Sequence, residues 1–288
     1  MFSCPHTFLR RFPCGVFVAA VAFGAFAVVT GASPAAAALP RPAHVVVIVE
    51  ENKSFSQIVG NPQAPYINAL ARRGALFTNA HGVTHPSLPN YLALFAGVTN
   101  DNGDGCPATG VSPTAPNLGS ELIAAHRSFA GYSEALPSRG SPVCAAGTYA
   151  RKHAPWVAFD NVPRASHRRF ADFPRAFERL PTVAFVVPDV DDDMHDGSIA
   201  QGDGWLGAHL GPLLRWADAH DTLIVLTWDE GFDAANSVAT VLYGPMVRAG
   251  RYPQHISHYD VLRTLEDLYA LAPSGRAKQA SDIAGCWR

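Results

Sequence analysis

The sequence predicts an α/β protein with a doubly wound, mostly parallel sheet in an α/β/α sandwich. Short runs rich in Val, Ile and Leu, without polar alternation, are typical of strands buried on both faces of a parallel sheet. These runs alternate along the chain with segments of helical periodicity, as repeated βα units do. The 288 residues contain no internal repeat and no linker long enough to divide a domain, so one domain is expected.

The individual elements follow from these patterns and from their end signals. The helix expected at 66–73 is closed by Gly74 and the apolar run 91–96 by Gly97, because glycine commonly ends helices. The expected strands are 44–50, 76–79, 129–134, 182–187, 222–227 and 238–243. The expected helices are 66–73, 91–96, 118–127, 205–220 and 260–271, with loop-rich or irregular segments at 99–117 and 138–173. Ligand sites in such a sheet lie outside the carboxyl ends of the strands.

Residues 1–39 have the pattern of an export signal peptide. Arg10 and Arg11 precede an apolar stretch at 15–29, and the alanine-rich run 32–38 offers several A-x-A cleavage sites. We expect cleavage there, which leaves a catalytic domain at 40–288, secreted to the cell envelope or outside the cell, with no integral membrane segment. The alternative is an uncleaved anchor, although the apolar core is short for a membrane span.

The mature chain is mildly acidic and keeps three cysteines. The full chain has 22 Lys and Arg against 24 Asp and Glu, a net charge of -2, and loss of the two leader arginines leaves 20 against 24, or -4. This balance does not indicate a nucleic-acid binder. In an exported protein Cys106 and Cys144, both in loop-like sequence, are expected to pair, and the alternative is that Cys286 pairs instead.

Ser87 stands between two prolines, directly ahead of the apolar run 91–96. Pro89 suits the first turn of a helix, where its missing N–H costs nothing. Ser87 is therefore expected in the turn before a helix N-terminus, where backbone N–H groups and the helix dipole favour an oxyanion or a phosphate. It is a candidate nucleophile, and the alternative is an ordinary helix cap.

Acidic residues follow three of the expected strands. Glu51 and Asn52 follow the first, Asp229 and Glu230 follow the strand 222–227, and five Asp with one His lie within 189–196. Each loop alone could be a solvated acidic loop. Because parallel strands end at one edge of a sheet, and because so many like charges repel without a cation, the sequence predicts a metal site at that edge.

Six blocks of the sequence resemble the signature blocks of the phosphoesterase family, within the alkaline phosphatase superfamily. They are 51–55, 85–91, 149–155, 188–197, 202–206 and 227–231, and they run in order over essentially the whole mature chain. The family holds acid phosphatases and phospholipases C. The resemblance therefore implies an alkaline-phosphatase-like fold and a hydrolase of phosphoric esters that uses a divalent metal ion.

The resemblance also implies roles for the matching residues. Ser87 matches the nucleophile, which takes the phosphoryl group to form a phosphoserine that water then hydrolyses. Glu51, Asn52, Asp229 and Glu230 match metal-binding positions, and Asp191 and His258 match metal positions more loosely. His195 either belongs to a second metal site or protonates the leaving-group oxygen. The candidates for binding the phosphate are Lys53, Asn90, Lys152 and His153, with ordinary surface charge as the alternative for the basic side chains.

The serine nucleophile, the Asp-Met-His-Asp block 193–196 and the short chain resemble the acid phosphatase branch, which includes secreted mycobacterial-type enzymes acting on phosphoinositides. The phospholipase C branch usually has threonine as its nucleophile and a His soon after the Asp-Glu pair, where this chain has Ala234. The expected substrate is a small phosphate monoester or a phosphoinositide. The alternatives are a phosphodiesterase or phospholipase C, and a non-catalytic exported protein that binds cations or phosphate.

The identity of the ion stays open at this point. Oxygen ligands favour calcium or magnesium, whereas coordination by His195 and His258 would suit zinc or manganese. One ion and two ions are both compatible with these residues.

Overall fold

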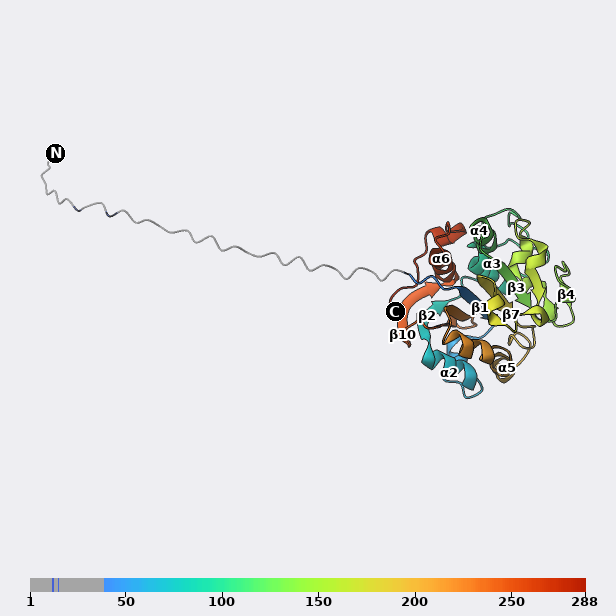
Figure 1. The fold of residues 1–288 in the computed structure, drawn as a ribbon, viewed down its shortest axis with the longest axis horizontal. Coiled ribbons are helices and arrows are strands. Elements are labelled where there is room, and N and C mark those ends of the chain that lie inside the picture. Colours follow the sequence, from blue (N-terminus) through green and yellow to red (C-terminus); the bar gives the residue numbers. More distant parts are fainter. Residues whose placement is uncertain (1–11, 13–14, 16–38) are drawn as a thin grey trace, which may run out of the picture. The chain divides into compact units, whose positions relative to one another are not determined.

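The computed structural model describes residues 12, 15 and 39–288, and the expected signal peptide lies almost wholly outside the described residues. The strands of the main sheet are β1 His44–Glu50, β2 Ala75–His81, β3 Phe129–Ser133, β6 His167–Arg169, β7 Val183–Val187, β8 Thr222–Trp228, β9 Ser237–Tyr243 and β10 Gly250–Ser257. Their order across the sheet is β10-β2-β9-β8-β1-β7-β3-β6 (Figure 1). A separate pair is formed by β4 Ala145–Ala146 and β5 Tyr149–Ala150.

The sheet is mostly parallel, as the sequence predicts. In the described sheet β9 runs antiparallel to both of its neighbours, β2 and β8, and the other five pairings are parallel. The central strand β1 is buried on both faces, with residues 45–49 each at most 2% exposed. This is the environment that its run of branched apolar residues requires.

Helices cover both faces of the sheet. They are α1 Phe55–Ile58, α2 Pro65–Arg73, α3 Ser87–Ala96, α4 Leu118–Ala124, α5 Ile199–Ala217 and α6 His258–Leu268. The helices α3, α4 and α6 pack together on one side, and α2 packs with α5 on the other (Figure 1). This arrangement confirms the expected α/β/α sandwich.

The two edge strands are absent from the sequence prediction. β10 contains Pro253, has mostly exposed or half-exposed side chains, and pairs with β2 alone. β6 is three residues long and pairs with β3 alone. Edge strands tolerate proline and polar residues on both faces, so they lack the buried-strand pattern. The helix α5 also begins six residues before the expected start at 205.

The expected disulfide between Cys106 and Cys144 is present, and it closes a loop with a sequence separation of 38. Cys286 has a buried side chain and no disulfide partner among the described cysteines. The described helices include none that is both long enough and apolar enough to cross a membrane.

Candidate active site

The candidate site lies where three neighbouring parallel strands end. β1 lies between β7 and β8 in the sheet, so the segments that follow these strands meet. The backbone N–H of Asp229 donates to the Glu50 carbonyl at 3.0 Å, and the N–H of Glu51 donates to the Asp193 carbonyl at 2.8 Å. The sheet thus brings together acidic residues that are 179 and 142 positions apart in the sequence.

Ser87 is the first residue of α3, so it lies in the first turn of the helix rather than just before it. Its Oγ donates a hydrogen bond to Glu51 Oε2 at 2.9 Å, and the residue is 1% exposed. The helix ends at Gly97, whose φ of +66° is in the left-handed region that glycine favours. The candidate nucleophile is therefore fixed at a helix N-terminus and directed at the acidic edge of the sheet.

Asn90 shapes the turn that leads into Ser87. Its Oδ1 accepts hydrogen bonds from the backbone N–H groups of Val83 and Thr84, at 2.8 and 3.2 Å. Its Nδ2 donates to the carbonyls of Thr84 and Pro86, at 2.8 and 3.1 Å. The side chain is fully buried, and these contacts occupy most of its hydrogen-bonding capacity. Asn90 therefore stabilises the turn that contains Ser87, the candidate nucleophile.

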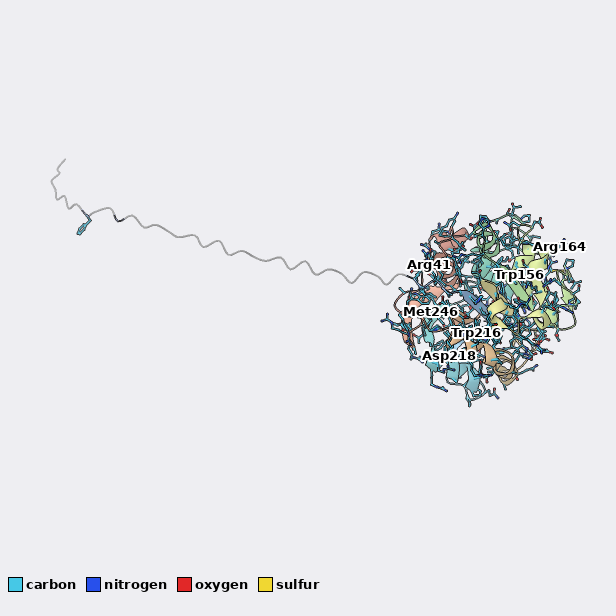
Figure 2. The ribbon with its side chains drawn as sticks, in the orientation of Figure 1. Arg41, Trp156, Arg164, Trp216, Asp218 and Met246 are labelled. Carbon is cyan, nitrogen blue, oxygen red and sulfur yellow. A yellow bond between two sulfur atoms is a disulfide. The ribbon has the colours of Figure 1, made fainter. Side chains whose placement is uncertain are left out.

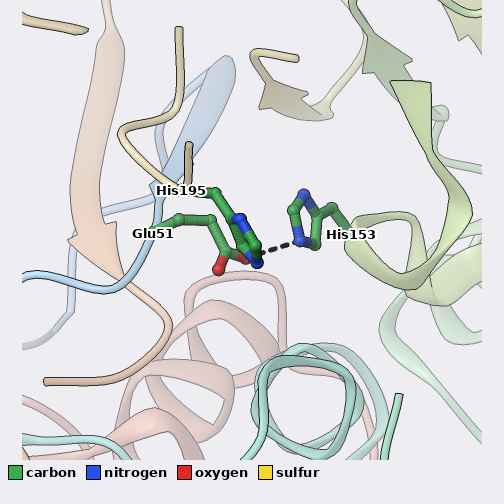
Figure 3. A group of neighbouring side chains, drawn as sticks. All are labelled: Glu51, His153 and His195. Atoms are coloured by element: carbon green, nitrogen blue, oxygen red, sulfur yellow. Dashed lines mark ion pairs between the residues drawn. The ribbon is translucent and has the colours of Figure 1, made fainter. Parts of the chain in front are cut away.

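His153 lies between two buried carboxyl groups. Its Nε2 is 3.0 Å from Glu51 Oε1 and its Nδ1 is 3.0 Å from Asp193 Oδ2. The ring of His153 stacks on Tyr91, with 5.2 Å between centroids, and the ring of His195 lies 5.7 Å away on a tilted plane. Figure 3 shows Glu51, His153 and His195 converging, and each offers a possible ligand atom within 4.8 Å of the others.

Burial governs the protonation of this cluster. Burial lowers the pKa of His153 well below its usual value, and the charges of Lys152 and His195 lower it further. Burial raises the pKa of Glu51, and the charges of Asp229 and Asp193 add to that shift. Burial also raises the pKa of Asp193. Without a compensating positive charge, the cluster therefore favours a neutral imidazole and protonated carboxyl groups.

Several buried oxygens at this edge have no hydrogen-bond partner among the described residues. They include Asn52 Oδ1, Asp229 Oδ2 and Glu51 Oε1, whose 3.0 Å contact with His153 Nε2 does not have the geometry of a hydrogen bond. Asn52 has φ +56°, a left-handed conformation that asparagine tolerates, and its backbone N–H donates to Asp229 Oδ1 at 3.0 Å. A buried oxygen without a partner is costly, and a cation bound by oxygen ligands removes that cost. The donor set of Glu51, Asn52 and Asp229 therefore fits a divalent metal ion.

Two lysines lie beside the acidic groups. Lys53 Nζ donates to the Met194 carbonyl at 2.5 Å. Lys152 Nζ donates to Asp104 Oδ2 at 2.9 Å and lies 3.0 Å from His195 Nε2. Burial alone would lower the pKa of Lys152, but the hydrogen bond to Asp104 and the charge of Glu51 outweigh it and raise that pKa. Lys152 therefore keeps its positive charge, which interacts with Glu51, the hydrogen-bond partner of Ser87.

Two of the expected metal ligands lie apart from this group. His258 Nε2 is 2.5 Å from the backbone carbonyl of Asp229. This contact holds the backbone in place directly after β8. Asp191 is half-exposed in the loop after β7 and belongs to neither of the described groups of possible metal ligands. The second of those groups is Glu134, Asp189 and Asp192. The structure thus gives His258 Nε2 a backbone partner, and the metal-binding roles of His258 and Asp191 stay predictions.

Three residues at the site lack an assigned role in the sequence analysis. Asp193 contacts the buried imidazole described above, and His85 Nδ1 is 2.7 Å from Glu230 Oε2. Asp104, in the loop after α3, accepts from Lys152 and from the backbone N–H at the start of α3. His85 lies inside a block that carries the family resemblance, and Asp193 lies inside another, so both had a sequence signal. Asp104 had none.

Comparisons with known proteins identify the family of the chain. A model of the phosphoesterase family matches residues 61–272. The chain is 52% identical over 257 residues to a phosphatidylinositol-3-phosphatase of Mycobacterium tuberculosis. The aligned region covers 88% of this chain and 85% of that protein. It is 34% identical over 232 residues to an acid phosphatase of Aspergillus fumigatus, and this aligned region covers 72% of this chain and 51% of that protein. The chain thus spans about half the length of the fungal relative.

A solved structure of a protein in the alkaline phosphatase superfamily from Vibrio parahaemolyticus is similar with a TM-score of 0.62. The match covers 86% of this chain and 72% of that one at 12% identity, so it concerns the fold and confirms the expected architecture. The family model and the mycobacterial relative confirm the resemblance drawn from the sequence blocks: this chain belongs to the phosphoesterase family.

Proposed function

We propose that this protein is a secreted, metal-dependent acid phosphatase that hydrolyses phosphate monoesters through a phosphoserine intermediate at Ser87. The observation that carries the proposal is the 2.9 Å hydrogen bond from Ser87 Oγ to Glu51 at the start of a helix. Buried oxygens without partners lie beside that contact. Both named relatives are phosphatases, which supports the reaction class.

Each residue of the site has a separate proposed role in phosphoryl transfer. A divalent ion bound at the edge would acidify the serine hydroxyl and neutralise phosphate charge. Glu51 orients Ser87 Oγ, and the N-terminal end of α3 favours the negative charge of the incoming phosphate. Lys152 Nζ supplies a further positive charge. His195 is the proposed donor of a proton to the leaving-group oxygen, and its Nε2, 3.0 Å from that ammonium, can take a proton from Lys152.

Phosphate release tests the function directly. We expect the purified protein to release p-nitrophenol from p-nitrophenyl phosphate, to lose that activity in a chelator, and to regain it with one of Ca²⁺, Mg²⁺, Zn²⁺ or Mn²⁺. Metal analysis of the protein as purified identifies the ion. Faster cleavage of bis(p-nitrophenyl) phosphate would favour a phosphodiesterase instead. Failure to cleave either ester with any of the four ions would leave a non-catalytic binder.

The finer substrate class follows from the mycobacterial relative, which is named for its action on phosphatidylinositol 3-phosphate. At 52% identity over most of both chains, a phosphoinositide is the proposed substrate of this protein as well. Release of inorganic phosphate from phosphatidylinositol 3-phosphate, compared with the 4- and 5-phosphates, tests this assignment. Equal rates on all three would contradict it.

Secretion rests on the sequence of residues 1–39 and agrees with the disulfide between Cys106 and Cys144, because such bonds persist in oxidising compartments. N-terminal sequencing of protein recovered from the culture medium or the cell envelope would locate the cleavage site. Recovery of the protein in the cytosol with its leader intact would contradict secretion.

Binding of the cation is expected to tighten as the pH rises from 5 to 7. Burial, followed by the charge of Glu230, raises the pKa of Asp229 to about 7, and burial also raises the pKa of Glu51. Below these pKa values the ion must displace protons, so its affinity changes by up to about tenfold per pH unit for each proton released. In the cation-free protein the same groups favour the fold at low pH and lose that contribution as the pH rises through their unfolded-state values toward 7.

Isothermal titration calorimetry with the activating ion, in two buffers of different ionisation enthalpy, measures both the affinity and the proton release. An affinity that is constant between pH 5 and 7, without proton release, would show that Asp229 and Glu51 are already ionised or do not bind the ion.

A further inference from the structure

An exposed aromatic ring lies at the edge of the candidate site. Phe232 follows Asp229, Glu230 and Gly231 directly, and it is 65% exposed. It is the most exposed large hydrophobic side chain within residues 39–288. An isolated exposed hydrophobic residue is ordinary on a protein surface. The position and the rigidity of this one distinguish it.

The backbone beneath Phe232 is held in place by buried groups. The backbone N–H groups of Phe232 and Asp233 donate to Ser54 Oγ at 2.8 and 3.0 Å, and Ser54 is 4% exposed. The N–H of Gly231 donates to Asn236 Oδ1 at 2.7 Å. A Cβ at Gly231 would lie 2.4 Å from a backbone carbonyl, so the chain passes too closely there for a side chain. The ring is therefore presented on a fixed turn, so the backbone beneath it has little entropy left to lose when a ligand contacts the ring.

Phe232 lies beside His85, and His85 connects it to the nucleophile. The two rings are nearly parallel, at 18°, with their centroids 6.4 Å apart. Face-to-face stacked rings are closer than this, so the rings are offset and leave ring surface uncovered. His85 Nδ1 contacts Glu230 at 2.7 Å, its side chain is 51% exposed, and it precedes Ser87 by two residues. The two rings thus form a continuous aromatic surface between the acidic edge of the sheet and solvent.

A polar cavity opens on the side of His85. It has a volume of about 500 Å³, within the range of small-molecule sites, and its lining includes His85, Thr84, Asn100, Tyr259 and Arg276. These side chains offer hydrogen-bond donors and acceptors. A leaving group that departs from phosphorus on the side of His85 would therefore meet an aromatic surface and polar side chains together.

We propose that Phe232, with the ring of His85 beside it, is a specificity-determining contact for the leaving group of the substrate. It selects phosphate monoesters whose leaving group is a ring with an apolar face over monoesters of short aliphatic alcohols. The proposal rests on the phosphatase function proposed above and extends it to the part of the substrate that the nucleophile does not touch.

Steady-state kinetics on two soluble esters tests the contact. The ring substrate is p-nitrophenyl phosphate and the aliphatic one is glycerol 2-phosphate. For Phe232→Ala we expect the ratio of kcat/KM for the ring ester to that for the aliphatic ester to fall by roughly three- to tenfold, mainly through KM, which is the range of one aromatic contact. Phe232→Tyr, which keeps the ring, should restore the ratio. Taking the ratio cancels the different reactivities of the two leaving groups.

The matched control is Ile123→Ala in α4, another exposed hydrophobic residue, which should leave the ratio unchanged. An unchanged ratio in Phe232→Ala would overturn the proposal. An equal fall on both esters would also overturn it, because it would show that Phe232 only holds the turn after Glu230.

Two further measurements separate the remaining outcomes. Calorimetric binding of phenylphosphonate and methylphosphonate, in the presence of the divalent ion, requires no turnover. Tighter binding of phenylphosphonate to the wild type than to Phe232→Ala supports the contact even if the protein proves to be catalytically inactive.

Hydrolysis of phosphatidylinositol 3-phosphate is then compared between the lipid in vesicles and its soluble dibutanoyl form. A defect of Phe232→Ala confined to vesicles would show a contact with the lipid surface and overturn the ring assignment.

Discussion

Ser87→Ala is expected to lower kcat for p-nitrophenyl phosphate by roughly three to six orders of magnitude, as removal of catalytic nucleophiles does. The hydroxyl that donates to Glu51 at 2.9 Å is the atom proposed to attack phosphorus, and alanine offers no substitute. The residue is 1% exposed and its side chain is small, so the fold should survive the change. Phosphate release at saturating substrate and activating ion measures the effect.

The same variant separates an enzyme from a passive binder. Stabilisation by the divalent ion, followed as a shift in Tm, should persist in Ser87→Ala because the acidic ligands remain. Ser87→Thr keeps a hydroxyl at the same position and should retain measurable turnover. It should also show an initial burst of p-nitrophenol while phosphate becomes bound to the enzyme. If Ser87→Ala kept most of the wild-type activity, the nucleophile would have to be another group and the phosphoserine intermediate would be wrong.

The parts of the structure that local patterns determine could be predicted from the sequence. The strand 44–50 has the same bounds in the prediction and in the structure, because a run of Val and Ile between polar residues coincides with a central strand buried on both faces. The end of α3 at Gly97 was predicted for a similar reason, since the left-handed φ there is a local property of glycine. The sequence also predicts that the ends of β1 and β8 meet, and the structure confirms that these strands are neighbours; the metal-binding roles of the residues after them stay predictions.

The remaining features depend on contacts that no local pattern contains. Asp104 accepts a hydrogen bond from Lys152, 48 positions away in the sequence, and His85 contacts Glu230, 145 positions away. His153 was expected to bind phosphate as a basic side chain, yet the structure places it 2% exposed between two carboxyl groups, where burial lowers its pKa. Its environment is created by segments after β1 and β7 that meet only in the folded sheet.

Glu51→Gln is expected to lower kcat/KM by at least about 100-fold and to weaken binding of the activating ion. Glutamine keeps the size of the side chain and can still accept from Ser87, but it lacks the negative charge that a divalent ion requires. Glu51 also contacts His153 at 3.0 Å, so the change removes a charge at the centre of the site. Kinetics over a range of ion concentrations separate the two losses, because excess ion should restore part of the activity.

Glu50→Gln is the matched control for this prediction. Glu50 is the neighbouring residue, is equally buried, and has two carboxyl oxygens without hydrogen-bond partners. Successive side chains of a strand point to opposite faces. After burial, the charges that raise the pKa of Glu50 are those of Asp193, Asp192, Asp203 and Glu134, and no described hydrogen bond joins its carboxyl group to Ser87. Burial raises the pKa of Glu50, which favours the protonated carboxyl group that a glutamine amide resembles in size and polarity. Its activity and ion affinity should stay within about threefold of wild type. Equal losses in both variants would show that buried acidity at the end of β1 supports the fold, and that Glu51 has no special relation to the serine.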